Sequence, residues 1–176
     1  MADDTPYGAD TLLEEVLGER RRTATYHRFR AGVLEQGTRL ELAVDEVLAA
    51  STARTAGLAE QLRADVMWRL PVPVRLSLLN DLLERKDLVD RFPFISPVLR
   101  KFFDLRHLLA HGFALPMDLE EKVLRVATIK KGRPQTVSFS LPHVAWLIRE
   151  ASQVQIELVT AVWAAVVPAD EGWHED

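Results

Sequence analysis

The chain has 176 residues, of which 48% are hydrophobic and 27% are charged, and its formal net charge is −4 at pH 7. This length allows one domain with a substantial core. The negative charge argues against a protein that binds nucleic acid through bulk positive charge, although it leaves room for a local basic cleft. The absence of cysteine excludes disulfides and thiolate metal sites, and the sequence shows no secretory signal or membrane-spanning stretch, so we expect a cytoplasmic protein.

The N-terminal half carries the spacing of apolar residues that is typical of helices. We predict a mobile tail over 1–10 and a helical pattern from Thr11 to about Ala50. Three glycines argue against one unbroken helix in that stretch: Gly18, Gly32 and Gly37. The single domain that we predict covers 11–168, and an acidic tail over 169–176 follows it.

Two shorter helices are predicted next, one from near Thr55 to Leu70 and one to about Arg85, with Pro71 and Pro73 ending the first and starting the second. In the first of them we expect the apolar side chains to face inward: Leu58, Leu62, Val66 and either Met67 or Trp68. The second carries a stripe of leucines at helical spacing.

A strongly apolar helix follows, with Ser96 as its cap, Pro97 at its first position and Gly112 as a left-handed residue that closes it. The pattern then changes: 123–129 and 135–140 are rich in β-branched residues and flank a short basic turn, which predicts a small hairpin. Ser140 is expected to cap a last helix of about 26 residues.

Arg106, His107 and His111 lie within the apolar helix, although such side chains resist burial unless they are paired. Their chemistry suits the cutting of RNA without a metal. A guanidinium holds a phosphate and stabilises the charge that develops on it. An imidazole takes a proton from a ribose 2′-OH or gives one to the leaving 5′-oxygen.

The spacing of these three residues also leaves other interpretations open. His107 and His111 are one helical turn apart and share a face, whereas Arg106 is about 140° from His111 on an ideal helix. A site would therefore need relaxation at the helix end or the same helix from a second subunit. Arg22 and His27 show the same spacing without any assigned chemistry. A structural alternative has His111 interacting with the helix dipole and Arg106 buried against a carboxylate such as Asp104 or Glu84.

The stretch Leu105-Arg106-His107-Leu108-Leu109-Ala110-His111-Gly112 resembles the signature of the HEPN superfamily. In that signature an Arg followed by Asn, Asp or His precedes a His by four to six residues. The resemblance also covers the helical layout over about 40–167. It implies an all-α, HEPN-like bundle of about four to five main helices, here with the small β-hairpin inserted before the long C-terminal helix.

The same resemblance implies a function. HEPN proteins are usually dimeric and often metal-independent endoribonucleases of toxin–antitoxin or defence systems. Arg106 and His111 would be the catalytic pair, His107 would orient them, and two motif helices would face each other in a homodimer. The implied partners are an RNA substrate and an antitoxin or regulatory protein, with no cofactor and no metal. Many members instead serve as non-catalytic modules that dimerise or bind a protein or nucleotide, and this alternative stays open.

One residue departs from the family pattern. In members regulated by a nucleotidyltransferase antitoxin, a Tyr two residues beyond the motif His is modified, and here that position is Phe113. This puts that form of regulation in doubt. Several basic side chains are candidate RNA contacts near the motif or at the hairpin tip: Arg100, Lys101, Lys130, Lys131 and Arg133.

Overall fold

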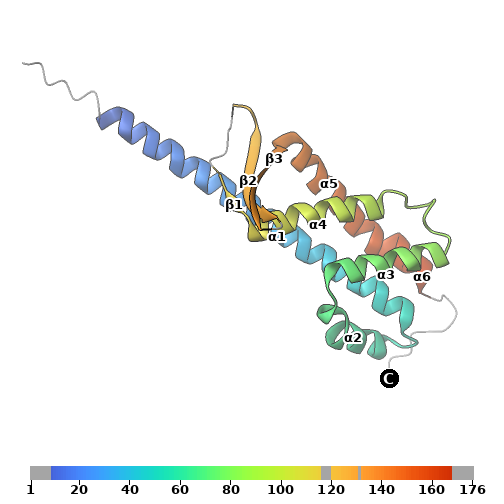
Figure 1. Ribbon diagram of the computed structural model, residues 1–176. Helices are drawn as coiled ribbons and strands as arrows, with labels where there is room; N and C mark the ends of the chain where they lie inside the picture. Colours follow the sequence, from blue (N-terminus) through green and yellow to red (C-terminus); the bar gives the residue numbers. More distant parts are fainter. Residues whose placement is uncertain (1–8, 116–119, 131, 168–176) are drawn as a thin grey trace, which may run out of the picture. The chain divides into compact units, whose positions relative to one another are not determined.

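Helices make up most of the chain, and a small antiparallel sheet precedes the last of them (Figure 1). The computed structural model describes residues 9–115, 120–130 and 132–167. Its elements, in chain order, are α1 (Ala9–Thr52), α2 (Ala56–Asp65), η1 (Met67–Arg69), α3 (Val72–Arg85), α4 (Ile95–His111), β1 (Phe113–Ala114), β2 (Val123–Lys130), β3 (Arg133–Ser140), α5 (Leu141–Glu157), η2 (Leu158–Val162) and α6 (Trp163–Val166). The prediction of a mainly helical fold with a hairpin before the last helix is confirmed at this level.

The chain forms two compact units that share three of the helices. Unit 1 comprises Met1–Leu34 and His107–Val144, and unit 2 comprises Glu35–Arg106 and Ala145–Asp176. The predicted tails fall outside the described residues, except that α1 already begins at Ala9.

The first helix is longer than the glycines suggested. α1 continues without a break through Gly18, Gly32 and Gly37, so the expectation of an interruption is wrong. Each helical glycine costs about 1 kcal/mol relative to alanine. Burial of apolar side chains along α1 outweighs this cost: Val33, Leu40, Val44, Val47 and Leu48.

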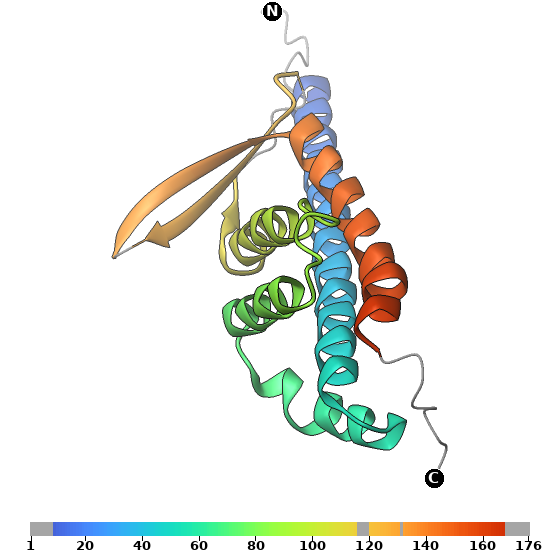
Figure 2. The same cartoon turned by 90° about the vertical axis from the view of Figure 1, so that its right-hand side faces the viewer.

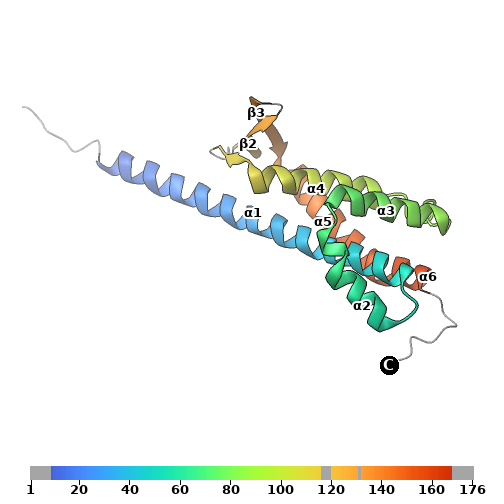
Figure 3. The ribbon, with the colours of Figure 1, turned by 60° about the horizontal axis from the view of Figure 1, so that its bottom comes forward.

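Within unit 2, α3 and α4 lie side by side against α1, and α5 with its continuation runs along another side of α1 (Figures 2 and 3). Polar contacts accompany this packing. The Gln36 side-chain amide donates to Gln155 Oε1 at 3.0 Å, and the Ser96 hydroxyl bonds to the side chain of Asn80. The largest fully buried side chains of the unit include Leu40, Leu79, Leu83, Ile95, Leu99, Phe102, Leu105 and Leu158.

Two local predictions in unit 2 are wrong. No residue of α2 is buried, and of the apolar side chains expected to face inward only Met67 is buried, whereas Trp68 is exposed. α4 begins at Ile95, so Ser96 lies inside the helix and its hydroxyl bonds to Asn80 rather than capping the helix.

Unit 1 contains the sheet, in the order β1-β2-β3 with both pairs antiparallel. Leu124 and Val126 of β2 are fully buried. The predicted hairpin is confirmed, and its turn includes Gly132, which has a positive φ of 74°. The short strand β1 was not predicted from the sequence.

Gly112 does not adopt the left-handed conformation that we expected at the end of α4. It is instead a point of close approach, because a Cβ there would overlap the side chain of Val126 and the carbonyl oxygen of Leu108. The Ser140 cap is confirmed: the His143 N–H donates to Ser140 Oγ at 3.2 Å. The last helix covers the predicted length, but it contains a π-helical turn, η2, that periodicity alone did not indicate.

Candidate active site

Arg106 is held by a carboxylate of α1. Its Nη1 lies 2.8 Å from Oε1 of Glu41, and the Arg106 side chain remains 29% exposed. The buried atoms Arg106 Nε and Glu41 Oε1 make no hydrogen bond within the described residues. The contact is therefore an ion pair without aligned hydrogen bonds, which positions the guanidinium but leaves the buried Nε of Arg106 without an acceptor.

Gly37 makes room for the Arg106 side chain. A Cβ added at Gly37 would overlap the Cδ of Arg106 and approach its Nε to 2.5 Å. Gly37 is buried, one turn before Glu41 on α1. The same face of α1 thus supplies both the space that Arg106 occupies and the carboxylate that attracts it.

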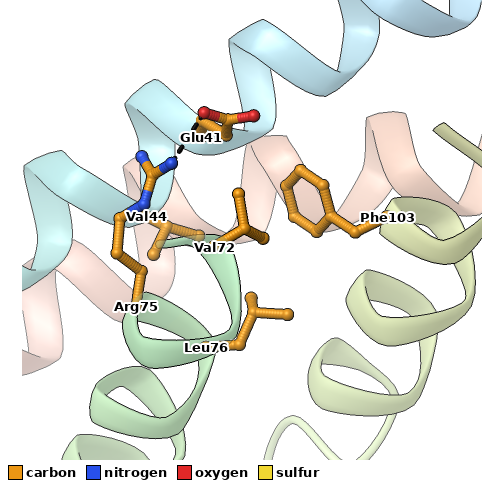
Figure 4. Close-up of a pocket in the computed structure, with 6 residues that line it drawn as sticks. All are labelled: Glu41, Val44, Val72, Arg75, Leu76 and Phe103. Atoms are coloured by element: carbon orange, nitrogen blue, oxygen red, sulfur yellow. Dashed lines mark hydrogen bonds and ion pairs between the residues drawn. The ribbon is translucent and has the colours of Figure 1, made fainter. Parts of the chain in front are cut away.

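Glu41 also binds a second arginine. Arg75 Nη2 donates to Glu41 Oε2 at 2.7 Å, while Arg75 Nη1 donates to Asp45 Oδ2 at 2.8 Å. Figure 4 shows Arg75 reaching from α3 to Glu41, with Val44 beside it and Phe103 on the far side of Val72. Arg75 and Asp45 are the buried charged residues of the described chain.

The electrostatics of this cluster follow from burial and pairing. Removal from water raises the pKa of Asp45, although Arg75 acts in the opposite direction. Burial alone would lower the pKa of Arg75, but hydrogen bonds from Arg75 to Glu41 and Asp45 outweigh it and raise that pKa. With Arg106 included, two guanidiniums meet two carboxylates, so we call this set the charged cluster (Glu41, Asp45, Arg75 and Arg106).

The charged cluster corrects one structural expectation. The carboxylate beside Arg106 is Glu41, not Asp104 or Glu84, both of which are exposed. Sequence reasoning missed Glu41, Asp45 and Arg75. A signal was present: Glu41 and Asp45 are four residues apart, among apolar positions that the same pattern placed in the core.

His107 and His111 lie on the same face at the end of α4, as their spacing predicted, with their rings in contact and tilted. Their ring centroids are 4.7 Å apart with an interplanar angle of 52°, and both side chains are exposed. Arg30 Nη2 donates to the carbonyl oxygen of Ala110 at 3.1 Å and so satisfies one acceptor of the last turn. The two imidazoles therefore project from a helix end that is held to α1 within unit 1.

The boundary between the two units falls between Arg106 and His107. Arg106 is described with unit 2 and the imidazoles with unit 1. That Arg106 and His111 act together stays a prediction.

The basic candidates are all at the surface where they are described. Arg100 and Lys101 are exposed on α4 in unit 2. Lys130 and Arg133 are exposed and face each other in register at the end of the hairpin, whereas Lys131 lies outside the described residues. In the comparison pair, His27 is exposed with its ring 5.7 Å from that of Tyr26, and the Arg22 side chain is outside the described part.

Within 9–115, 120–130 and 132–167, no three His, Asp or Glu side chains come close enough to hold a metal ion. None of the helices over the same residues is both long and apolar enough to cross a bilayer.

Comparison of the chain with protein-family models, with curated proteins and with solved structures gives no match.

Proposed function

We propose that the chain is a metal-independent endoribonuclease of the HEPN type that acts as a homodimer. The observation that carries this proposal is the exposed pair of imidazoles, 4.7 Å apart, directly after a guanidinium on the same helix. The resemblance of 105–112 to the HEPN signature supports RNA cleavage as the reaction. Toxin or defence activity, with an antitoxin or regulatory protein as partner, belongs to the same proposal.

The reaction is attack by a ribose 2′-OH on the adjacent phosphodiester. A bond forms between the 2′-oxygen and phosphorus, and the bond from phosphorus to the 5′-oxygen breaks. The 2′-OH proton goes to a base and the leaving 5′-oxygen receives a proton, so the products are a 2′,3′-cyclic phosphate and a 5′-OH. His111 transfers a proton in this step, and His107 orients it through the ring contact.

Arg106 stabilises the charge on the phosphate oxygens. Its ion pair with Glu41 and the space above Gly37 restrict its rotamers before RNA binds, which lowers the entropy lost when it contacts a phosphate. In the homodimer, α4 from each protomer faces its partner, so that the Arg106 of one protomer and the His111 of the other complete a site. The polar residues exposed along α4 suit such a wet interface: Arg100, Lys101, Asp104, His107 and His111.

The test is cleavage of RNA in EDTA by the purified wild type, by Arg106→Ala and by His111→Ala. The matched control is His27→Ala, which removes an exposed imidazole with the same sequence spacing from an arginine. We expect cleavage by wild type and His27→Ala, and a loss of about 10²- to 10⁴-fold in His111→Ala. Equal cleavage by all four proteins would overturn the proposal.

One observation favours a second candidate, a non-catalytic module that dimerises or binds a protein or nucleotide. Glu41 already engages Arg106, as expected of a structural arginine. In this case no folded variant and no wild-type preparation cleaves RNA, while Glu41→Gln and Arg106→Ala lower stability by similar amounts. Chemical denaturation of both variants, measured beside the cleavage assay, separates the two candidates.

A further inference from the structure

An open groove of about 400 Å³ lies between α1 and the last helix on unit 2. Six residues line this groove: Arg39, Leu42, Ala43 and Glu46 of α1, Gln155 of α5 and Val159 of η2. Two of them are large apolar side chains at the surface, since Leu42 is 50% exposed and Val159 is 46% exposed. Ile156, which is 54% exposed, precedes Val159 by three residues and so lies beside it on the helix. Single exposed apolar residues are ordinary, but three around one groove are typical of a surface that another molecule covers.

The walls of the groove are held in place by packing and by one hydrogen bond. Ala43 is almost fully buried. The Gln36 side-chain amide donates to Gln155 Oε1 at 3.0 Å, which ties α1 to α5 at a residue of the groove wall. Val159 belongs to the π-helical turn η2, and such turns are frequent at functional sites. The groove is therefore a fixed feature of two packed helices and not a space between loops.

The groove carries opposite charges on either side of its apolar centre. Arg39 and Glu46 are both exposed, and they lie seven residues, or about two helical turns, apart on α1. Leu42 and Ala43 are midway between them. Arg39 forms an ion pair with Glu35 of its own helix at 2.6 Å, and both side chains of that pair are exposed. Such a pair contributes little to stability, so Arg39 is able to bind a further carboxylate.

This arrangement is complementary to itself when two copies of the chain meet with their α1 helices antiparallel. A twofold axis through the midpoint of Leu42 and Ala43 brings Arg39 of each copy beside the partner's Glu46, because the two charges lie equally far from that point along the helix. Parallel helices would instead bring like charges together at both positions. A ligand of one charge sign, such as RNA, would attract one end of the groove and repel the other.

We propose that the groove is a self-association surface, on which a second copy of this chain docks its α1 antiparallel to the first. Leu42 of each copy fills the partner's groove, and Arg39 pairs with the partner's Glu46. The surface consists of α1 and the last helix, so it is separate from the exposed side of α4 that the proposed function uses, and it does not depend on RNA cleavage. Two twofold interfaces on one chain allow a closed tetramer, whereas the groove alone gives a dimer.

The experiment measures self-association by sedimentation velocity over a range of protein concentrations. The proteins are wild type, Leu42→Glu, Arg39→Glu and Glu46→Arg, each alone, and an equimolar mixture of the two charge variants. The matched control is Leu58→Glu, which places the same charge at an exposed leucine of α2 in the same unit. Circular dichroism checks that every variant is folded.

We expect Leu42→Glu, Arg39→Glu and Glu46→Arg, each alone, to raise the dissociation constant for self-association by at least about 10-fold, with Leu58→Glu unchanged. The wild-type assembly then falls to half its mass, from tetramer to dimer or from dimer to monomer. The mixture of Arg39→Glu with Glu46→Arg should recover the wild-type mass, because one protein carries two acidic side chains and the other two basic ones, so both contacts are complementary again.

A wild type with the same mass as Leu42→Glu would overturn the inference and leave the groove to a different partner. Variants that dissociate but do not recover on mixing would overturn the antiparallel pairing of Arg39 with the partner's Glu46. Failure of the proposed function looks different: the protein would self-associate through the groove as described and leave RNA uncut.

Discussion

Arg106 and His107 are neighbours in the sequence, but their surroundings differ: the Arg106 side chain is held by an ion pair, and the His107 side chain is exposed. Arg106 lies over Gly37 and beside Glu41, within a cluster whose other arginine is buried. His107 and His111 are exposed, and the contact described between them is a ring contact. The two regions therefore differ in what substitution should change: stability in the charged cluster and reactivity at the imidazole pair.

The comparison also bears on how the Arg106 side chain is positioned before a ligand binds. A lone arginine on a helix samples many rotamers, and binding a phosphate would freeze them at a cost. Sharing Glu41 with Arg75 restricts Arg106, while the Arg106 side chain stays 29% exposed.

The largest expected effect is on the charged cluster. Arg75→Met keeps the apolar volume of the side chain but leaves Asp45 buried without its guanidinium, and we expect a loss of about 3–5 kcal/mol in the free energy of unfolding. Burial already raises the pKa of Asp45. A carboxyl with a raised folded pKa stabilises the fold below its unfolded pKa and loses that contribution as pH rises. Urea denaturation should therefore show that Arg75→Met lowers the free energy of unfolding less at about pH 4 than at about pH 7.

The control for that prediction is Arg39→Met, which removes an arginine from an exposed ion pair with Glu35 on the same helix as Glu41. We expect it to cost less than about 1 kcal/mol. Equal losses in the free energy of unfolding in Arg75→Met and Arg39→Met would contradict the claim that the charged cluster contributes more to stability than an exposed ion pair.

Two of the three glycines of α1, Gly32 and Gly37, give a sharper comparison, because alanine has opposite expected effects at them. A Cβ at Gly32 meets nothing within 4 Å, so Gly32→Ala should stabilise the helix by about 0.5–1 kcal/mol. Gly37→Ala would displace the Arg106 side chain and should destabilise the protein by about 1–3 kcal/mol. Thermal denaturation of Gly32→Ala and Gly37→Ala measures whether each variant is more or less stable than wild type. Stabilisation by Gly37→Ala would show that the Arg106 side chain moves away at no cost.

Glu41→Gln tests whether the cluster serves the proposed reaction. It removes the charge that positions Arg106 but keeps the shape of the side chain. We expect kcat to fall about 10- to 100-fold with little change in KM, because a misplaced group is felt in the transition state more than in substrate binding. A purely structural Glu41 would lower stability and leave kcat of the folded fraction unchanged.

The smallest expected effect is the stability change on removing an imidazole. His107→Ala removes an exposed side chain and should alter the free energy of unfolding by less than about 0.5 kcal/mol. Its RNA cleavage should still fall, because His107 orients His111 in the proposed mechanism. A large loss of stability in this variant would place His107 with the structural residues.

Local signals in the sequence were enough for much of the fold. Helical spacing located α3, α4 and the last helix, and β-branched residues around a basic turn located the hairpin. The capping role of Ser140 followed from a rule that depends only on neighbouring residues. The same kind of rule misplaced Ser96, because Asn80 of another helix competes for its hydroxyl.

What the sequence did not predict depends on which helices meet. Nothing local to Arg106 indicates Glu41 as its partner, and nothing near Gly37 indicates that an arginine will cross it. The unbroken α1 has the same origin, because tertiary packing outweighed the low helix propensity of its glycines. The imidazole pair was predictable because both residues lie one turn apart on a single helix.

The most direct measurement is the chemical identity of the RNA ends that the wild-type protein produces in EDTA, read by mass spectrometry. The account predicts 2′,3′-cyclic phosphate and 5′-OH ends, together with no cut at any position where the RNA carries a 2′-deoxyribose. Ends with a 5′-phosphate, or cutting that continues at 2′-deoxy positions, would contradict the attack by the 2′-OH on which the roles of Arg106 and His111 rest.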